Sequence, residues 1–151
     1  MKLPYREGSV FLVPLSGGGY ARGVVARAAP KGKILLGYFF GPRLSSGEAG
    51  TSAELRPSDA VLRVRFGDLG LIRGEWPVLG VLPSWSRSEW PMLQFVRRDP
   101  LGKMKPRLVE YSDEDPSRRL TERVVEDDAG LQPDSLSGYG AVSTIPDNLL
   151  Q

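Results

Sequence analysis

The sequence SVFLVPL at residues 9–15 is followed by the glycine-rich segment SGGG at residues 16–19 and by YARGVVARA at residues 20–28. The two outer segments are rich in β-branched, aromatic and small apolar residues, which is typical of strands. A short glycine-rich loop between them predicts a β-hairpin. A nucleotide-binding phosphate loop would need a helix after the glycines, so we favour the hairpin. In the first strand both sets of alternating side chains are apolar, so we expect both of its faces to be covered. Pro14 offers no backbone N–H, so we expect it at a sheet edge or a bulge.

Further strand-like segments follow along the chain. The strongest is ILLGYFF at residues 34–40, which Gly41-Pro42 is expected to end. Other expected strands cover residues 62–66, 69–76, 92–97 and 107–111, and the first of these alternates apolar residues with arginines, as in a half-exposed strand. Residues 43–60 are loop-like with weak periodicity, and residues 117–126 fit a short helix or a strand. If helices occur, we expect them in 43–60 or 114–126.

These patterns predict an α+β, β-rich fold: a single domain over residues 1–151, with a strongly bent antiparallel sheet, or partial barrel, and few short helices. The 18 Gly and 13 Pro among 151 residues favour many turns and argue against a helical bundle. Six residues in the apolar segments are expected to be largely buried: Phe11, Val13, Val25, Leu35, Phe39 and Trp76.

The composition excludes several classes of enzyme. The chain has no cysteine and no histidine, so it has no disulfide, no thiol nucleophile and no Ser-His-Asp triad. We therefore expect no catalytic residues, no metal site and no cofactor. No apolar run follows the basic N-terminus, and none is long enough to span a membrane, so we expect a cytoplasmic protein without membrane partners.

The charges are distributed unevenly along the chain. Residues 1–109 carry 17 Lys and Arg against 8 Asp and Glu, whereas residues 110–151 carry 3 against 10. The acidic part could pair with the basic part of the same domain, or it could form a surface for a basic partner. It has neither the spacing of a calcium loop nor a defined pair of catalytic carboxylates, although an enzyme using carboxylates is a further alternative. The acidic candidates for partner binding are Asp113, Glu114, Asp115, Asp127 and Asp128.

Three tryptophans occur within 15 positions, at Trp76, Trp85 and Trp90. Tryptophan is common both in binding hot spots and in the cores of small β folds. Trp76 lies in an apolar setting, which favours the core, while Trp85 and Trp90 fit either role. Together with Tyr111, these two are the aromatic candidates for partner binding.

Basic residues are also interleaved with the predicted strands. A face that binds nucleic acid could be formed by Arg22, Arg27, Lys31, Lys33, Arg63 and Arg65. No recognised nucleic-acid motif accompanies them, so dispersed surface charge is the simpler interpretation. A small β-barrel adaptor or a nucleic-acid-binding module remains the alternative function.

The order of three motifs resembles the immunity protein 26 family. The segment from Glu7 to Val25 is similar to the family's opening pair of strands, although Ser9 stands where aspartate is common. Residues 74–80, GEWPVLG, are similar to its Trp-Pro-Val-Ile-Gly stretch, and residues 138–142, GYGAV, to its closing segment. The middle region, residues 43–60, has no counterpart in these motifs.

The resemblance implies a non-catalytic bacterial immunity protein that binds and neutralises the cognate toxin domain of a polymorphic toxin system. Toxins of this kind are often nucleases, whose surfaces must attract phosphate. Because an inhibitor of such a surface gains association rate from carboxylates, we expect the acidic stretch to meet the toxin.

Overall fold

The computed structural model describes residues 2–45, 55–83, 85–127, 130–134 and 136–137. The elements of these residues are, in chain order, β1 (Ser9–Pro14), β2 (Tyr20–Ala28), β3 (Ile34–Leu44), the 3₁₀ turn η1 (Pro57–Asp59), β4 (Leu62–Gly67), α1 (Leu69–Ile72), β5 (Val78–Val81), the 3₁₀ turn η2 (Arg87–Glu89), β6 (Gln94–Arg97), β7 (Arg107–Tyr111), β8 (Arg119–Val124), β9 (Gln132–Pro133) and β10 (Leu136–Ser137).

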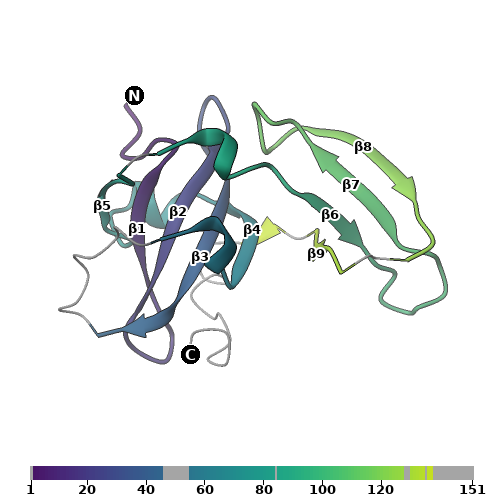
Figure 1. The fold of residues 1–151 in the computed structure, drawn as a ribbon, viewed down its shortest axis with the longest axis horizontal. Helices are drawn as coiled ribbons and strands as arrows, with labels where there is room; N and C mark the ends of the chain where they lie inside the picture. The colour runs from purple at the N-terminus through teal and green to yellow at the C-terminus, as the bar shows by residue number, and fades with distance from the viewer. Residues whose placement is uncertain (1, 46–54, 84, 128–129, 135, 138–151) are drawn as a thin grey trace.

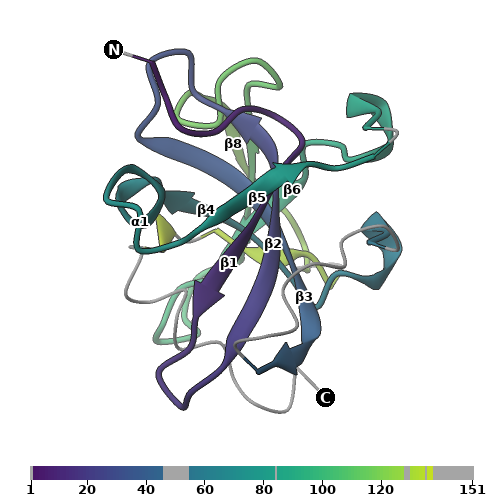
Figure 2. The same ribbon diagram turned by 90° about the vertical axis from the view of Figure 1, so that its left-hand side faces the viewer.

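The strands form two sheets, which lie side by side in Figure 1. The first has the order β10-β4-β3-β2-β1-β5 and the second the order β8-β7-β6-β9. All pairs are antiparallel except the short β10–β4 and β6–β9 pairs. Neither sheet closes into a barrel, and register shifts between β2 and β3 curl the first sheet (Figure 2). The predicted β-rich fold class with few short helices is therefore confirmed, with its strands divided between two sheets.

The first sheet is covered on both faces because its central strands are apolar on both. One face holds a core in which the rings of Phe11 and Trp76 stack with centroids 5.8 Å apart. The other face packs against the second sheet through residues such as Val24 and Phe40 from the first sheet and Val109 from the second. All six residues expected to be buried are buried: Phe11, Val13, Val25, Leu35, Phe39 and Trp76.

Two details of the hairpin strands concern prolines. Pro14 lies at the end of β1 beyond the three residues that pair with β5, so the N–H it lacks is not needed there, as predicted. The prediction that Gly41-Pro42 ends the third strand is wrong, because β3 continues to Leu44 and Tyr20 pairs with that residue across a register shift. The shift lets the strand pass a residue that cannot donate to the ladder.

The predicted strand over residues 69–76 is also wrong. Residues 69–72 form α1, and the backbone N–H of Trp76 then bonds to the carbonyl of Gly70 at 3.0 Å. A Cβ on Gly70 would lie 2.6 Å from the Trp76 ring, so only glycine allows this close packing. Packing of one buried indole therefore overrides the weak strand pattern. Of the described helical elements only η1 lies within the expected ranges, since residues 119–124 form a strand.

The longest helix in the described part of the chain is α1, with four residues, and no helix there could cross a membrane.

Candidate functional site

The acidic stretch is divided by β8 into two separate places. The loop of residues 112–118 precedes this strand, and Asp127 follows it. A strand of six residues spans about 20 Å, so the two groups of carboxylates lie at opposite ends of the β7–β8 hairpin. Asp128 lies outside the described residues. The structure therefore does not gather the five acidic candidates into one patch.

Arg87 joins segments that are far apart in the sequence. Its Nε donates to Glu7 Oε1 at 2.8 Å and its Nη1 to Asp113 Oδ2 at 2.5 Å. It also donates to the backbone carbonyl of Asp113, and its Nη2 lies 3.8 Å from Glu114 Oε2. One guanidinium on η2 thus fixes carboxylates from the N-terminal segment and from the loop after β7.

Asp113 is held a second time by an arginine of the core. The buried Arg27 on β2 donates from Nε to Asp113 Oδ1 at 2.9 Å and from Nη1 to the carbonyls of Ala26 and Trp90. Partial burial raises the pKa of the Asp113 carboxyl, but the hydrogen bonds and charges of Arg87 and Arg27 outweigh this and hold the pKa below its usual range. Asp113 is therefore ionised and doubly bound to its own chain.

The neighbouring carboxylates differ in their exposure. Asp115 accepts from the backbone N–H of Ser117, and so shapes the loop. Glu114 extends from the same loop with its side chain 84% exposed, and Glu89 on η2 is exposed as well. Glu114 and Glu89 are thus exposed carboxylates that this region presents to a partner.

Trp85 and Trp90, which fitted either role in the sequence, differ in how deeply they are buried. Trp90 is 2% exposed, and its ring packs against Tyr38 at 5.1 Å between centroids. Trp85 is half-buried and lies over Gly8, where a Cβ would come within 2.8 Å of the indole. Its ring lies 5.8 Å from that of Trp90, so the buried indole supports the more exposed one.

We refer to the surface formed by five residues around Arg87 as the acidic corner: Glu7, Trp85, Glu89, Asp113 and Glu114. Sequence analysis named three of these and missed Glu7 and Glu89. Glu7 is brought in by Arg87, a contact across 80 positions that no local pattern signals. Glu89 could have been found, because it lies between the two candidate tryptophans.

Tyr111, the third aromatic candidate, lies in the core between the sheets. Its hydroxyl donates to Asp134 Oδ1 at 2.7 Å, and the guanidinium of Arg65 lies 3.8 Å above its ring centroid. Burial and the hydrogen bond to Asp134 raise the pKa of Tyr111 to about 12. At 7% exposure, the side chain offers almost no surface to a partner.

The Asp134 carboxylate is the centre of this buried cluster. Arg65 from the first sheet approaches Oδ1 at 3.2 Å, and Arg97 from the second sheet approaches Oδ2 at 2.8 Å. Burial raises the pKa of the Asp134 carboxyl, but the hydrogen bonds from Tyr111 and Arg97 and the charge of Arg65 outweigh it and lower the pKa. The cluster links the two sheets, and nothing in the sequence around Asp134 signals it.

The six basic residues named as a possible nucleic-acid face are not all exposed, since Lys31 and Lys33 are exposed but Arg27 and Arg65 are not. Arg27 and Arg65 are buried and paired with carboxylates, although the alternation in β4 predicted an exposed Arg65. Arg22 and Arg63 donate to backbone carbonyls, and Arg63 also lies over the Tyr38 ring. Arginines from the basic part of the chain, residues 1–109, thus pair with carboxylates from the acidic part, residues 110–151.

The acidic corner has the parts of a binding surface. It combines fixed carboxylates with a supported indole, while the cations it contains are already engaged by those carboxylates. In the part of the chain that the structure describes, no group of three or more acidic side chains is placed to hold a metal ion.

Comparison with known proteins gives the class of this chain. The sequence model of the family described as immunity protein 26 matches residues 6–106, about two thirds of the chain. The chain therefore belongs to the immunity protein 26 family, as the motifs at residues 7–25 and 74–80 indicated. The third motif, at residues 138–142, lies outside the match and outside the described residues. Membership makes it an immunity protein, an inhibitor of a toxin. No curated protein and no solved structure matches it.

Proposed function

We propose that this immunity protein neutralises its cognate toxin by stoichiometric binding through the acidic corner, without chemistry of its own, in the cytoplasm of the cell that produces the toxin. The bound surface of the toxin is basic, as the substrate-binding surface of a nuclease is. One observation carries the proposal: Arg87 holds carboxylates from two remote segments beside the partly buried Trp85.

The arrangement suits fast and specific capture. Exposed carboxylates attract a basic surface over several ångströms and raise the association rate. Because Glu7 and Asp113 are already fixed by Arg87, they lose little conformational freedom when a partner binds. Trp85 adds apolar area next to the charges, as aromatic anchors do in binding hot spots.

The remaining candidates take supporting parts in this proposal. Trp90 supports Trp85 from below, Asp115 shapes the loop, and Tyr111 fixes the strand that leads into it. Asp127 follows β8 at the far end of the hairpin, so it contacts the same toxin only where the toxin surface extends along the second sheet.

The test uses Glu89→Lys with Glu114→Lys, because Asp113 is bound to a buried arginine and its loss would perturb the fold. The control, Asp59→Lys with Glu75→Lys, makes the same charge change at exposed positions that are not part of the acidic corner. The probe is an inactivated form of the toxin domain encoded by the neighbouring gene, immobilised for kinetic measurements at increasing salt.

We expect the Glu89/Glu114 variant to associate about ten-fold more slowly than the control, with a smaller change in dissociation. The wild-type association rate should fall as salt rises. An association rate equal to that of the control, together with a salt-independent wild-type rate, would exclude the acidic corner as the toxin-binding surface.

A further inference from the structure

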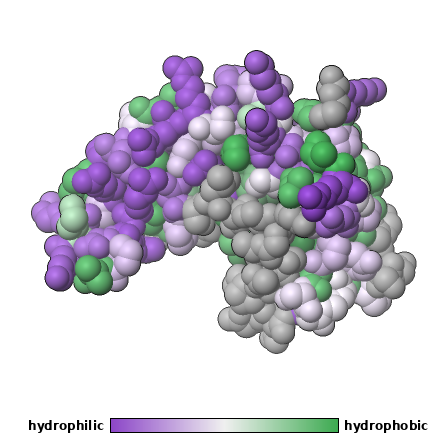
Figure 3. Space-filling view, turned by 180° about the vertical axis from the view of Figure 1, so that it is seen from behind, coloured by the Kyte–Doolittle hydropathy of each residue, from purple (hydrophilic) through white to green (hydrophobic). Residues whose placement is uncertain are grey.

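A second surface with different chemistry lies at the far end of the second sheet. Residues 98–106, which we call the arm loop, connect β6 to β7 and lie at the lower right in Figure 1. Leu101 is 75% exposed and Met104 is 62% exposed, the two highest values among the large hydrophobic residues that the structure describes. Seen from behind in Figure 3, this end of the molecule shows hydrophobic side chains among hydrophilic ones, on a part of the molecule whose visible surface is otherwise mainly hydrophilic.

The arm loop is fixed in its shape by one carboxylate. Asp99 accepts hydrogen bonds from the backbone N–H groups of Leu101, Lys103 and Met104 at 2.9–3.1 Å. These bonds, that of Leu101 above all, lower the pKa of the Asp99 carboxyl. Gly102 adopts a positive φ of 67° at the turn, where its N–H bonds back to the Asp99 carbonyl. The exposed side chains are therefore presented from an ordered backbone.

The surroundings of these apolar side chains are cationic. Arg97 and Arg107 flank the loop, which itself carries Arg98, Lys103 and Lys105. Its only carboxylate, Asp99, is occupied by the backbone. Arg97 and Arg107 also pair with Glu122 on β8, and Lys105 pairs with Glu126 in the segment after that strand. The surface around the loop therefore carries charges of both signs, while the loop itself is basic.

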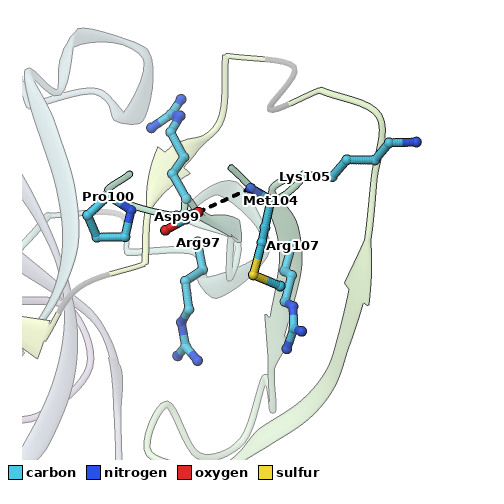
Figure 4. Close-up of a pocket in the computed structure, with 7 residues that line it drawn as sticks. Arg97, Asp99, Pro100, Met104, Lys105 and Arg107 are labelled. Carbon is cyan, nitrogen blue, oxygen red and sulfur yellow. Dashed lines mark hydrogen bonds between the residues drawn. The ribbon is translucent and has the colours of Figure 1, made fainter. Parts of the chain in front are cut away.

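The apolar and basic groups meet at a shallow cavity of about 300 Å³. In Figure 4 the Met104 side chain points the same way as Arg97 and Arg107 and lies between them, while Lys105 points away. A partner side chain placed in this cavity would contact the Met104 thioether beside Arg97 and Arg107, two guanidinium groups that Glu122 holds in place. An apolar group next to a carboxylate is the chemistry that fits such a cavity.

We propose that the arm loop is a second toxin-binding site, which takes an apolar patch of the toxin bordered by carboxylates. The inference rests on the proposed function and deepens it. Methionine and arginine are enriched in protein–protein interfaces, and a fixed loop lowers the entropic cost of binding. The loop has no aromatic residue on which a base could stack, so a protein partner fits it better than single-stranded nucleic acid.

The two sites differ in charge and lie at opposite ends of the β7–β8 hairpin. A toxin that meets the acidic corner with a basic surface and the arm loop with an acidic one can bind in one orientation only. Reversal would bring like charges together at both sites, which is costly. The pair of sites would thus select the cognate toxin among others that are merely basic.

The test replaces both apolar side chains of the arm loop, as Leu101→Glu with Met104→Glu. A second variant, Leu101→Ser with Met104→Ser, removes the apolar area and leaves the charge unchanged. The control, Leu69→Glu with Ile72→Glu, makes the same chemical change at two exposed positions on α1. Circular dichroism and thermal unfolding establish that each variant is folded, and the probe is again the inactivated toxin domain encoded by the neighbouring gene.

We expect the glutamate variant to dissociate at least ten times faster than the control and the serine variant to dissociate several times faster. Equal dissociation of all variants, with binding still weakened by the Glu89/Glu114 variant, overturns the arm-loop site and leaves the proposed function standing. Failure of the wild-type chain to bind or neutralise the toxin overturns the proposed function itself. Wild-type binding to a single-stranded RNA oligonucleotide that the Leu101/Met104 variants lose, without a change in toxin binding, also overturns the arm-loop proposal.

Discussion

Replacement of Asp134 by alanine tests whether the buried ionic cluster holds the two sheets together. The Asp134 side chain is 1% exposed and receives hydrogen bonds from Arg65, Arg97 and Tyr111. Truncation leaves the largely buried guanidinium of Arg65 without its carboxylate and the Tyr111 hydroxyl without its acceptor. Arg97 is half-exposed and keeps Glu122, so most of the cost falls on the other two groups.

Loss of one partner from a buried ion pair destabilises a protein by about 3–5 kcal/mol, because the remaining charge stays buried. We expect the lower end of this range for Asp134→Ala, since water can reach the space that the carboxylate leaves. For a chain of this length, 3 kcal/mol corresponds to a fall in Tm of roughly 6–12 °C. Asp134→Asn keeps an acceptor for Tyr111 but loses the charge, and we expect it to cost about 1.5–3 kcal/mol.

Urea unfolding followed by circular dichroism measures these changes as shifts in the midpoint. Glu126→Ala serves as the control, because this carboxylate is exposed and pairs only with the exposed Lys105 in the described contacts, so we expect a change within about 0.5 kcal/mol. A change of that size for Asp134→Ala would show that the cluster does not hold the sheets together.

The effect of Asp134 should also depend on pH. The pKa of the carboxyl is lower in the folded chain than in the unfolded chain, so ionised Asp134 stabilises the fold above its unfolded pKa of about 3.9. That contribution is lost as the pH falls through the folded pKa. The difference in unfolding free energy between the wild type and Asp134→Asn should therefore be constant near neutral pH and shrink below about pH 4. A difference that persists unchanged in strong acid would contradict this assignment of charge.

The remaining predictions concern the packing of the first sheet. Trp76→Ala should destabilise the fold by about 3–5 kcal/mol, because the indole stacks on Phe11 inside the core, and a loss within about 0.5 kcal/mol by urea unfolding would place it on the surface. Gly37→Ala should cost about 1–3 kcal/mol, since its Cβ would lie 2.5 Å from the Phe66 ring. Gly67→Ala is the matched control for crowding, because a Cβ there meets only the Lys33 carbonyl oxygen at 3.8 Å and Gly67 has no positive φ. Equal costs at Gly37 and Gly67 would exclude crowding as the cause.

Sequence analysis correctly predicted the strands that are determined by residues close together in the sequence. The SGGG loop between two apolar segments determines the β1–β2 hairpin, and the alternation of Val64 and Phe66 determines the inward face of β4. The apolar character of both faces of β1 correctly indicated that it is covered twice. These features depend on side-chain period and turn chemistry, which a single chain displays without knowledge of its partners.

The features that sequence analysis missed depend on partners far along the chain. Arg65 looks like a solvent-exposed position of β4, but Asp134, 69 positions away, makes its burial possible. Residues 69–72 look like a weak strand, but the buried indole of Trp76 requires a turn of helix there. The acidic stretch looks like one patch, but the length of β8 divides it. In each case a contact that is remote in sequence decides between two locally acceptable structures.

The charge asymmetry of the chain therefore has a different meaning in the folded structure. Had the acidic part remained wholly free, it would have formed a broad and unspecific attractor for any basic surface. Instead Asp113 and Asp134 pair with Arg27, Arg65 and Arg97 from the basic part, and such pairs fix geometry more than they add stability. In the part of the chain that the structure describes, fewer carboxylates then remain for a partner, and Glu7 and Asp113 of the acidic corner are held in place by Arg87. An inhibitor that must recognise one toxin gains more from a few fixed charges than from many mobile ones, because fixed charges favour one orientation and disfavour the rest.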